Sequence, residues 1–259
     1  MDLGLKGRKA IVTGATRGIG RAIAEALADE GCAIGLCARK PEEVAETVAA
    51  LRRKGVQACG QVLDVADGAA LRAWVGTAAA ELGGLDIVVS NVSAMGGLTG
   101  DEGWRRYFEV DLMGTVRVVE AARPLLEQSE AACIIVIGSI ASLETGHDVF
   151  PDGFLQAYGA TKAALANYVA EISRTLGPFG IRANTVSPGP IHFPGGVWHK
   201  RELSGDPMYK KALEHTRLRG GLGRPEDVAR AVAFLASPAA AHISGANLVI
   251  DGAFTRRVN

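Results

Sequence analysis

The sequence predicts one α/β domain over residues 1–259, a doubly wound fold with a central, mostly parallel seven-stranded sheet and helices on both faces. Apolar, strand-like runs alternate with helical patterns along the whole chain. The strand-like runs are continuously apolar, which is typical of parallel strands that are buried on both faces. No linker, internal repeat, charge block or low-complexity tract divides the chain, so we expect a single domain.

The secondary structure follows from these patterns in chain order. The predicted strands cover residues 9–13, 32–38, 56–62, 85–90, 133–137, 181–186 and 247–250. The predicted helices cover residues 17–30, 41–54, 67–82, 101–127, 155–176 and 225–236. Pro41 and Pro225 stand at first helical positions, where proline is well tolerated, and Asp67 is a candidate N-cap. The pair Gly177-Pro178 ends the helix that precedes it.

The composition favours a compact protein with a large core. Apolar residues make up 48% of the chain, charged residues 22%, and the formal net charge is zero. This balance gives no general attraction to nucleic acid or to an anionic membrane. The apolar stretch at 131–137 is far shorter than the roughly 20 residues of a membrane helix, and no signal peptide is visible. Four cysteines without Cys-x-x-Cys spacing indicate free thiols, so we expect a cytoplasmic location.

A glycine-rich turn lies between the first strand and the first helix, with the sequence Thr13-Gly14-Ala-Thr-Arg17-Gly18-Ile-Gly20. Glycines at such a turn let the backbone approach a ligand closely, and the helix N-terminus offers unpaired N–H groups to a pyrophosphate. The strand–turn–helix context favours a dinucleotide site over a plain tight turn, which is the alternative.

A second motif, Tyr158-Gly-Ala-Thr-Lys162, lies in the helix predicted over 155–176. Residues four apart lie on the same helix face, so the phenol and the ammonium would share one site. A cation beside a tyrosine favours the phenolate and makes the phenol a better proton carrier for an alcohol or carbonyl oxygen. Taken alone, the same spacing also arises in chance surface pairs.

Together the two motifs, Gly-x-x-x-Gly-x-Gly and then Tyr-x-x-x-Lys, resemble those of the short-chain dehydrogenase/reductase family, over essentially the whole chain. Further matches follow in the family's order: Asp64, Asn91, Ser139, the segment from Asn184 to Gly189, Gly245, and Asp251-Gly252. The resemblance implies a Rossmann fold and reversible hydride transfer between a nicotinamide cofactor and a carbonyl or secondary alcohol. It implies no metal, and His192, His199 and His215 lack the tight spacing of a zinc site.

The resemblance also implies a set of cofactor-binding residues. Gly14, Gly18, Ile19 and Gly20 would hold the phosphates. Asp64 and Val65 would border the adenine, Asn91 the adenosine ribose, and the residues after the sixth strand the nicotinamide carboxamide. The full set is Gly14, Thr16, Arg17, Gly18, Ile19, Gly20, Arg39, Lys40, Asp64, Val65, Asn91, Tyr158, Lys162, Pro188, Gly189 and Ile191.

The second strand indicates which cofactor is bound. NAD selectivity usually relies on an acid at the end of this strand that accepts the ribose 2′-hydroxyl. The strand ends instead in Arg39 and Lys40, and Arg17 lies in the glycine turn. Arginine suits a 2′-phosphate, so we predict NADP(H), the alternative being that these are ordinary surface cations.

In the family, a tyrosine is the acid/base, a serine orients the substrate oxygen, and a lysine binds the nicotinamide ribose. These roles fall to Tyr158, Ser139 and Lys162. Asp111 stands where many members have an asparagine in a proton relay, and we keep it as a member of that relay. Ser93 departs from the family's Asn-Asn-Ala-Gly segment, since its side chain stands where the backbone usually approaches the cofactor.

The spacing between Ser139 and Tyr158 is longer than is common in the family, with the extra residues at 147–153. Ser142 is therefore a rival for the serine role, but Ser139 directly follows the apolar strand, and strand ends place active groups. The extra residues would form either a loop that borders the pocket or a contact between subunits.

The segment 190–223 is punctuated by glycine and proline and is expected to form a lid over the substrate, with Phe193 and Trp198 as wall residues. Simple packing on the sheet is the alternative. Between residues 197 and 211, basic side chains outnumber acidic ones, which suits an acyl carrier or a coenzyme A thioester as well as a solvated helix face.

A 3-oxoacyl thioester reductase is the first expectation, and a reductase or dehydrogenase of small ketones, sugars, polyols or steroids is the alternative. A hypothesis of another class is a non-catalytic dinucleotide-binding sensor or scaffold. From the family we also expect a homotetramer or homodimer.

Overall fold

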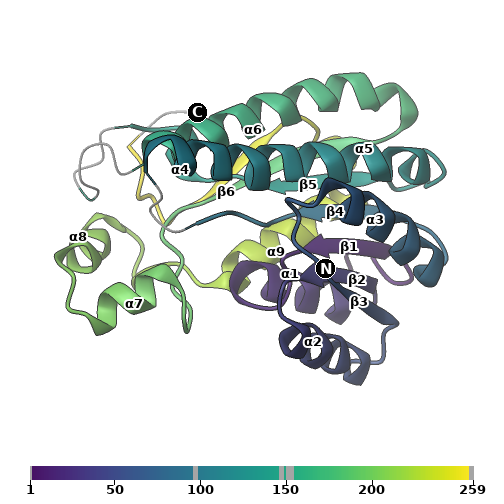
Figure 1. Ribbon diagram of the computed structural model, residues 1–259, viewed down its shortest axis with the longest axis horizontal. Helices are drawn as coiled ribbons and strands as arrows, with labels where there is room; N and C mark the ends of the chain where they lie inside the picture. The colour runs from purple at the N-terminus through teal and green to yellow at the C-terminus, as the bar shows by residue number, and fades with distance from the viewer. Residues whose placement is uncertain (1, 96–98, 146–148, 150–154, 257–259) are drawn as a thin grey trace.

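The computed structural model describes residues 2–95, 99–145, 149 and 155–256. Within this part, a seven-stranded sheet has the order β3-β2-β1-β4-β5-β6-β7, and every pair of neighbouring strands is parallel (Figure 1). The strands are β1 (Lys9–Thr13), β2 (Ala33–Ala38), β3 (Ala58–Val62), β4 (Ile87–Ser90), β5 (Cys133–Ile137), β6 (Arg182–Pro188) and β7 (Asn247–Ile250). The doubly wound fold predicted from the alternating pattern is confirmed.

Helices cover both faces of the sheet. Their bounds are α1 (Gly18–Asp29), α2 (Pro41–Arg53), α3 (Gly68–Leu82), α4 (Gly100–Tyr107), α5 (Gly114–Leu126), α6 (Gln156–Leu176), α7 (Val197–Leu203), α8 (Pro207–His215) and α9 (Pro225–Ala236). Side chains of α1, α2 and α9 form one core with one face of the sheet, and those of α3, α5 and α6 form another with the opposite face. Val12 and Ile11 fall in different cores because successive strand residues point to opposite faces.

The helix predicted over 101–127 is interrupted. Between α4 and α5, residues Phe108–Met113 form a π-helical segment, which the apolar pattern does not distinguish from a continuous helix. Such segments are rare and frequently lie at functional sites. This one contains Asp111, whose side chain is fully buried.

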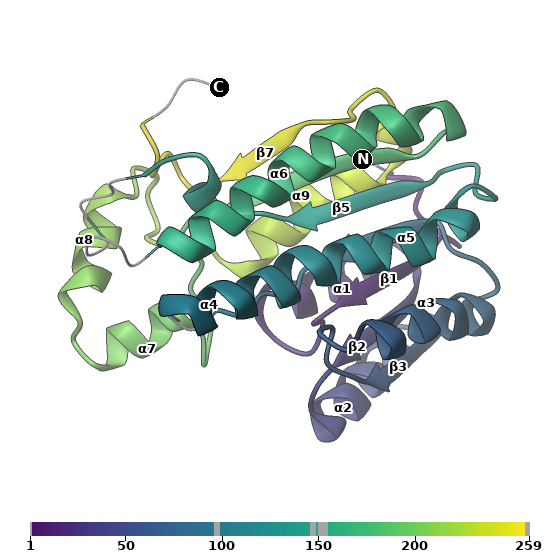
Figure 2. The ribbon, with the colours of Figure 1, turned by 45° about the horizontal axis from the view of Figure 1, so that its top comes forward.

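The two halves of the sheet diverge at the β1–β4 pair, since the chain runs outward to β2 and β3 on one side and to β5, β6 and β7 on the other. In doubly wound folds, ligands bind beyond the carboxyl ends of the strands at this point. Figure 2 shows β5 and β7 pointing toward α7 and α8, which stand away from the sheet at that edge. Among the described residues, no helix is long and apolar enough to span a membrane.

Candidate active site

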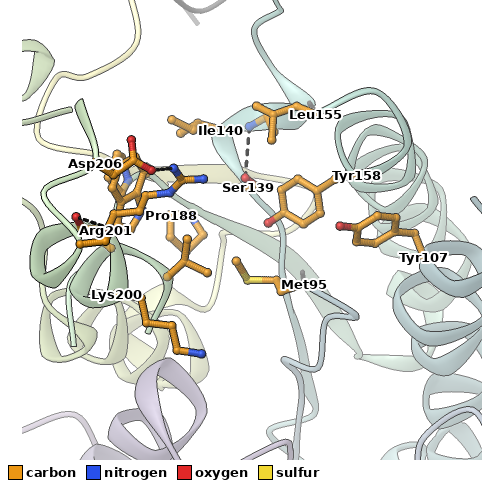
Figure 3. Close-up of a pocket in the computed structure, with 16 residues that line it drawn as sticks. Met95, Tyr107, Ser139, Ile140, Leu155, Tyr158, Pro188, Lys200, Arg201 and Asp206 are labelled. Atoms are coloured by element: carbon orange, nitrogen blue, oxygen red, sulfur yellow. Dashed lines mark hydrogen bonds and ion pairs between the residues drawn. The ribbon is translucent and has the colours of Figure 1, made fainter. Parts of the chain in front are cut away.

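Ser139 and Tyr158 face one cavity at the carboxyl end of the sheet. Ser139 caps the short 3-10 turn Ile140–Ser142 that follows β5, and its Oγ accepts a hydrogen bond of 3.2 Å from the backbone N–H of Ala141. Tyr158 lies in the first turn of α6. Figure 3 shows its ring beside Ser139, and both residues line the cavity. The structure therefore brings the two together as the sequence predicted.

The Ser142 side chain makes a local structural hydrogen bond. Its hydroxyl donates a 2.7 Å hydrogen bond to the carbonyl oxygen of Ser139, within the same short turn. It is absent from the residues that line the cavity, whereas Ser139 is among them. Of the two serines, Ser139 is the one that can contact a substrate in the cavity.

Lys162 lies one helical turn beyond Tyr158, and its side chain is only 2% exposed. The ammonium donates a 3.0 Å hydrogen bond to the carbonyl oxygen of Ile137, at the end of β5. It also lies 3.2 Å from Oδ1 of Asp111 and 5.7 Å from the centroid of the Tyr158 ring. A buried cation is thus held directly beside the phenol, as the spacing of four residues predicted.

Asp111 supplies the counter-charge for this buried cation. Its Oδ2 accepts a 2.7 Å hydrogen bond from the backbone N–H of Ala94. Its Oδ1 pairs with Lys162 and makes no hydrogen bond within the described part of the chain, so this atom retains capacity to accept one from water. The Asp111 carbonyl accepts from Thr115 Oγ1, which lies 2.8 Å from Ser90 Oγ, so polar contacts join β4 to the π-helical segment.

The glycine turn forms a tight cradle. A Cβ atom on Gly20 would overlap the carbonyl oxygen of Gly14 and Nδ2 of Asn91. Asn91 donates from Nδ2 to the carbonyl oxygens of Thr13 (3.0 Å) and Gly14 (3.2 Å), and so ties the turn to β4. Gly14 and Gly18 have positive φ values of 65° and 54°. The cradle at the start of α1 fits the pyrophosphate of a dinucleotide.

Charged residues surround the region where the adenosine end would lie. Arg17, Arg39 and Lys40 are exposed. Asp64 accepts from the backbone N–H of Ala66 and pairs with Arg106 at 3.1 Å. Burial by itself raises the pKa of the Asp64 carboxyl, but the Ala66 N–H, Arg106 and Arg39 outweigh it and lower that pKa. The carboxyl is therefore ionised at neutral pH.

Sequence reasoning missed Glu43, an acid in the first turn of α2. Its carboxylate accepts a hydrogen bond of 2.9 Å from the Thr16 hydroxyl, in the glycine turn, and pairs with Lys40 at 2.7 Å. The hydrogen bond from Lys40 is the main cause that lowers the pKa of this carboxyl, with a further contribution from Thr16. An acid that follows Pro41 is typical of any helix start, so its sequence carried no signal of a ligand site.

The substrate side is a cavity of about 730 Å³. Trp198 lines it, as predicted, together with Pro188 and Gly189. Phe193 is not among the lining residues, and its ring packs on the glycine turn instead, so that a Cβ atom on Gly18 would lie 2.5 Å from its Cζ. Lining residues that sequence reasoning missed include Met95, Tyr107 and Leu155. Tyr107 precedes the π-helical segment, and its ring centroid lies 5.7 Å from that of Tyr158.

Two departures from the family pattern are Ser93 and the extra residues at 147–153. Ser93 Oγ accepts from the backbone N–H of Met95, so its side chain is engaged in a local turn. The extra residues 147–153 lie outside the described residues except Val149, which is buried in one cluster with Ile140 and Trp198. Because both of these neighbours line the cavity, Val149 lies close behind its wall.

Within the described part of the chain, neither the histidines nor the cysteines form an alternative catalytic cluster. Among the described residues, no group of three or more His, Cys, Asp or Glu side chains could hold a metal ion. His192 is bound to Glu202 at 2.7 Å. The cysteines are free and buried, and burial raises the pKa of the Cys37 thiol to about 12, which leaves it protonated and unreactive.

A family model described as enoyl-(acyl carrier protein) reductase matches residues 14–255. The chain belongs to the short-chain dehydrogenase/reductase family. It is therefore an NAD(P)-dependent oxidoreductase. It is 37% identical to isoepoxydon dehydrogenase patN of Penicillium expansum, over 97% of this chain and 96% of that protein.

Two solved structures of similar proteins share the fold. One is L-sorbose reductase from Gluconobacter frateurii in complex with NADPH and L-sorbose, with a TM-score of 0.89, 30% identity and full coverage of both chains. The other is a 7α-hydroxysteroid dehydrogenase in complex with NADH and 7-oxo glycochenodeoxycholic acid. Its TM-score is 0.87 at 28% identity, over 100% of this chain and 98% of that one.

Proposed function

We propose that this protein interconverts a carbonyl and a secondary alcohol with NADP(H), and that Tyr158 is the acid/base. The observation that carries the proposal is the shared position of Ser139 and Tyr158 on one cavity, with the buried Lys162 ammonium directly behind the phenol. These are the elements that proton transfer to a substrate oxygen requires.

The hydrogen bonds around Ser139 favour its proposed role. Because Ser139 Oγ accepts from the Ala141 N–H, its own hydroxyl proton remains available to donate into the cavity. The Tyr158 side chain lies beside Ser139 at the same cavity, so both groups could hold one substrate oxygen (Figure 3). In reduction Tyr158 would give its proton to that oxygen, and in oxidation it would remove the proton. The bound nicotinamide would supply or accept the hydride.

Lys162 and Asp111 would support this proton transfer. The positive charge of Lys162 stabilises a phenolate at Tyr158, and its contact with Ile137 fixes the ammonium in place. Asp111 pairs with Lys162 at 3.2 Å and has an oxygen that can accept a hydrogen bond from water. This arrangement supports Asp111 as a member of a proton relay that leads away from the cavity.

For the cofactor, we propose that the glycine turn holds the pyrophosphate and that Arg17 and Arg39 contact a 2′-phosphate. Both guanidinium groups are exposed at the adenosine end, and β2 has no acid at its end. Asp64 and Val65 would border the adenine, while Pro188, Gly189 and Ile191 would hold the carboxamide. The similar L-sorbose reductase was solved with NADPH, which supports this choice.

For the substrate, we propose a compact cyclic or polyhydroxylated carbonyl compound. The cavity is lined by apolar side chains, among them Ile140, Leu155 and Trp198, and by the polar side chains of Lys200, Arg201 and Asp206. Arg201 is paired with Asp206, which offsets its positive charge. It therefore attracts an acidic acyl carrier less than a count of basic residues indicates. The similar isoepoxydon dehydrogenase and L-sorbose reductase support this class over a 3-oxoacyl thioester.

The first test is thermal stabilisation by NADPH and NADH at matched concentrations, followed by a panel of cyclic ketones, ketoses, steroid ketones and a 3-oxoacyl thioester. A ligand that binds only the native state must raise the melting temperature. We expect the larger shift with NADPH and the fastest turnover with a cyclic ketone or ketose. No shift with either cofactor would favour a role without cofactor, and a shift without turnover would favour a sensor or scaffold. Assembly into a homodimer or homotetramer stays a prediction, and the mass of the native protein in solution tests it.

A further inference from the structure

We infer that Glu43 limits the preference for NADP(H) over NAD(H). Its carboxylate would lie close to the 2′ position of the adenosine ribose, where it would disfavour a phosphate and accept a hydrogen bond from a hydroxyl. The inference rests on the proposed function, because it concerns the cofactor site of the same enzyme. It adds a residue that neither the glycine motif nor the end of β2 indicates.

The contacts of Glu43 place it at this end of the cofactor site. One carboxylate oxygen accepts from Thr16, which lies in the turn that would hold the phosphates, and the other pairs with Lys40, which directly follows Arg39 and the end of β2. The Glu43 backbone is held as well, because its carbonyl oxygen accepts a 2.6 Å hydrogen bond from Thr47 Oγ1. Glu43 therefore bridges the two segments between which a ribose 2′ group is bound in this fold.

The position along the chain agrees with this placement. In dinucleotide-binding folds the acid that accepts the ribose 2′-hydroxyl follows the glycine motif by about 20 residues. Glu43 stands 23 positions after Gly20, although on the first turn of α2 and not at the end of β2. Its side chain is 33% exposed, so a ligand in solution can reach it.

The charges around Glu43 give the direction of the effect. A 2′-phosphate would gain from Arg17 and Arg39 but would be repelled by the Glu43 carboxylate, which also engages Lys40. A 2′-hydroxyl carries no charge and can donate to the same carboxylate. Replacing Glu43 with glutamine removes the repulsion and releases Lys40, so the affinity for NADPH should rise relative to that for NADH.

The experiment measures dissociation constants of NADPH and NADH by calorimetry, on the full chain, for the natural protein and for Glu43→Gln. Glu42→Gln is the matched control, since Glu42 is an exposed acid in the same helical turn. We expect the ratio of the NADH to the NADPH dissociation constant to rise about fivefold or more in Glu43→Gln, and to change less than about twofold in Glu42→Gln. Because the interaction is partly exposed, the difference should shrink in high salt.

An unchanged ratio in Glu43→Gln, or an equal rise in Glu42→Gln, would overturn the inference. A parallel loss of both affinities would do so too, because it would mean that Glu43 only holds Thr16 in the turn. The ratio compares two ligands on one variant, so it stays informative if that variant is less stable. If the natural protein bound neither cofactor, the proposed function itself would fail, and that result is distinct from an unchanged ratio.

Discussion

Two lysine–carboxylate pairs of this protein differ in burial. The side chains of Lys162 and Asp111 are 2% and 0% exposed, and the pair lies behind the proposed catalytic tyrosine. Those of Lys40 and Glu43 are 68% and 33% exposed, and the pair lies at the adenosine end of the proposed cofactor site. Removing one charge of the buried pair leaves the other charge buried without a partner. In the exposed pair, water can replace either partner.

The difference in burial therefore suits the two lysine–carboxylate pairs to different roles. The buried pair fixes the position of a charge on which the proposed proton transfer would depend, and it resists change because each group also has a backbone contact. The exposed pair can separate when a ligand binds, which suits the role in cofactor preference that we infer for Glu43. Changes at the first pair should thus affect stability and turnover, and changes at the second should affect ligand preference.

The largest expected effect is at Asp111. Asp111→Ala leaves the Lys162 ammonium buried without its counter-charge, and we expect it to lower the free energy of unfolding by about 3–5 kcal/mol. Asp111→Asn should cost less, because the amide oxygen can still accept one hydrogen bond. Glu43→Ala, the matched change at the exposed pair, should cost at most about 1 kcal/mol. Denaturant unfolding measures all three, and equal costs at the two pairs would contradict the comparison.

The second effect concerns Gly18 in the glycine turn. Gly18→Ala places a Cβ atom 2.5 Å from the Phe193 ring at a φ of 54°, so it should destabilise through both strain and overlap. Gly55→Ala is the control, since Gly55 has a φ of 86° and no atom within 4 Å of an added Cβ. We expect Gly18→Ala to cost about 1–3 kcal/mol more than the control and to weaken cofactor binding. Adding Phe193→Ala should recover part of the difference, and no recovery would show that the ring is not the cause.

The Cys37 thiol gives a pH-dependent effect of intermediate size. Burial raises its pKa from the ordinary 9.0 to about 12, so above pH 9 the unfolded chain loses a proton that the native chain keeps. The contribution of this thiol to the free energy of unfolding is fully present below pH 9. It falls by about 1.4 kcal/mol per pH unit between pH 9 and pH 12. Cys37→Ala should unfold with a shallower alkaline dependence than the natural protein, measured between pH 8 and 10.5. If the free energy of unfolding depended on pH identically in Cys37→Ala and the natural protein, the native thiol would be in contact with water.

The smallest effect concerns salt. Raising ionic strength from about 0.05 to 0.5 M should weaken NADPH binding several-fold more than NADH binding, because only NADPH carries a 2′-phosphate, which the proposal places near Arg17 and Arg39. Turnover at saturating cofactor and substrate should change little, because the charges behind Tyr158 are buried and poorly screened. Equal salt sensitivity of the two cofactors would argue against a phosphate contact at these arginines.

The fold was largely predictable because it depends on local patterns. Continuous apolar runs located the strands, and Asp67 caps α3 as predicted, accepting from the N–H groups of Ala69 and Ala70. The pairing of Tyr158 with Lys162 followed from helical spacing. Each of these inferences needs only residues that are near one another along the chain.

What the sequence did not reveal depends on tertiary contacts. Thr16 and Glu43 are far apart in sequence, and only the arrangement of α2 beside the glycine turn brings them together. The packing of Phe193 on Gly18 likewise depends on where the chain turns after β6. The π-helical segment keeps an apolar pattern like that of an α-helix, so the full burial of Asp111 was not visible.

The account depends most on Tyr158 as the acid/base, and the most direct test compares three Tyr→Phe variants. Tyr158→Phe should lower kcat about 100-fold or more while the dissociation constant of the cofactor changes little. Tyr107→Phe removes the other phenol of the cavity, and Tyr168→Phe removes a half-buried phenol of α6 that does not line it. Both should retain kcat within about tenfold. Turnover preserved in Tyr158→Phe, or an equal loss in Tyr107→Phe, would contradict the assignment.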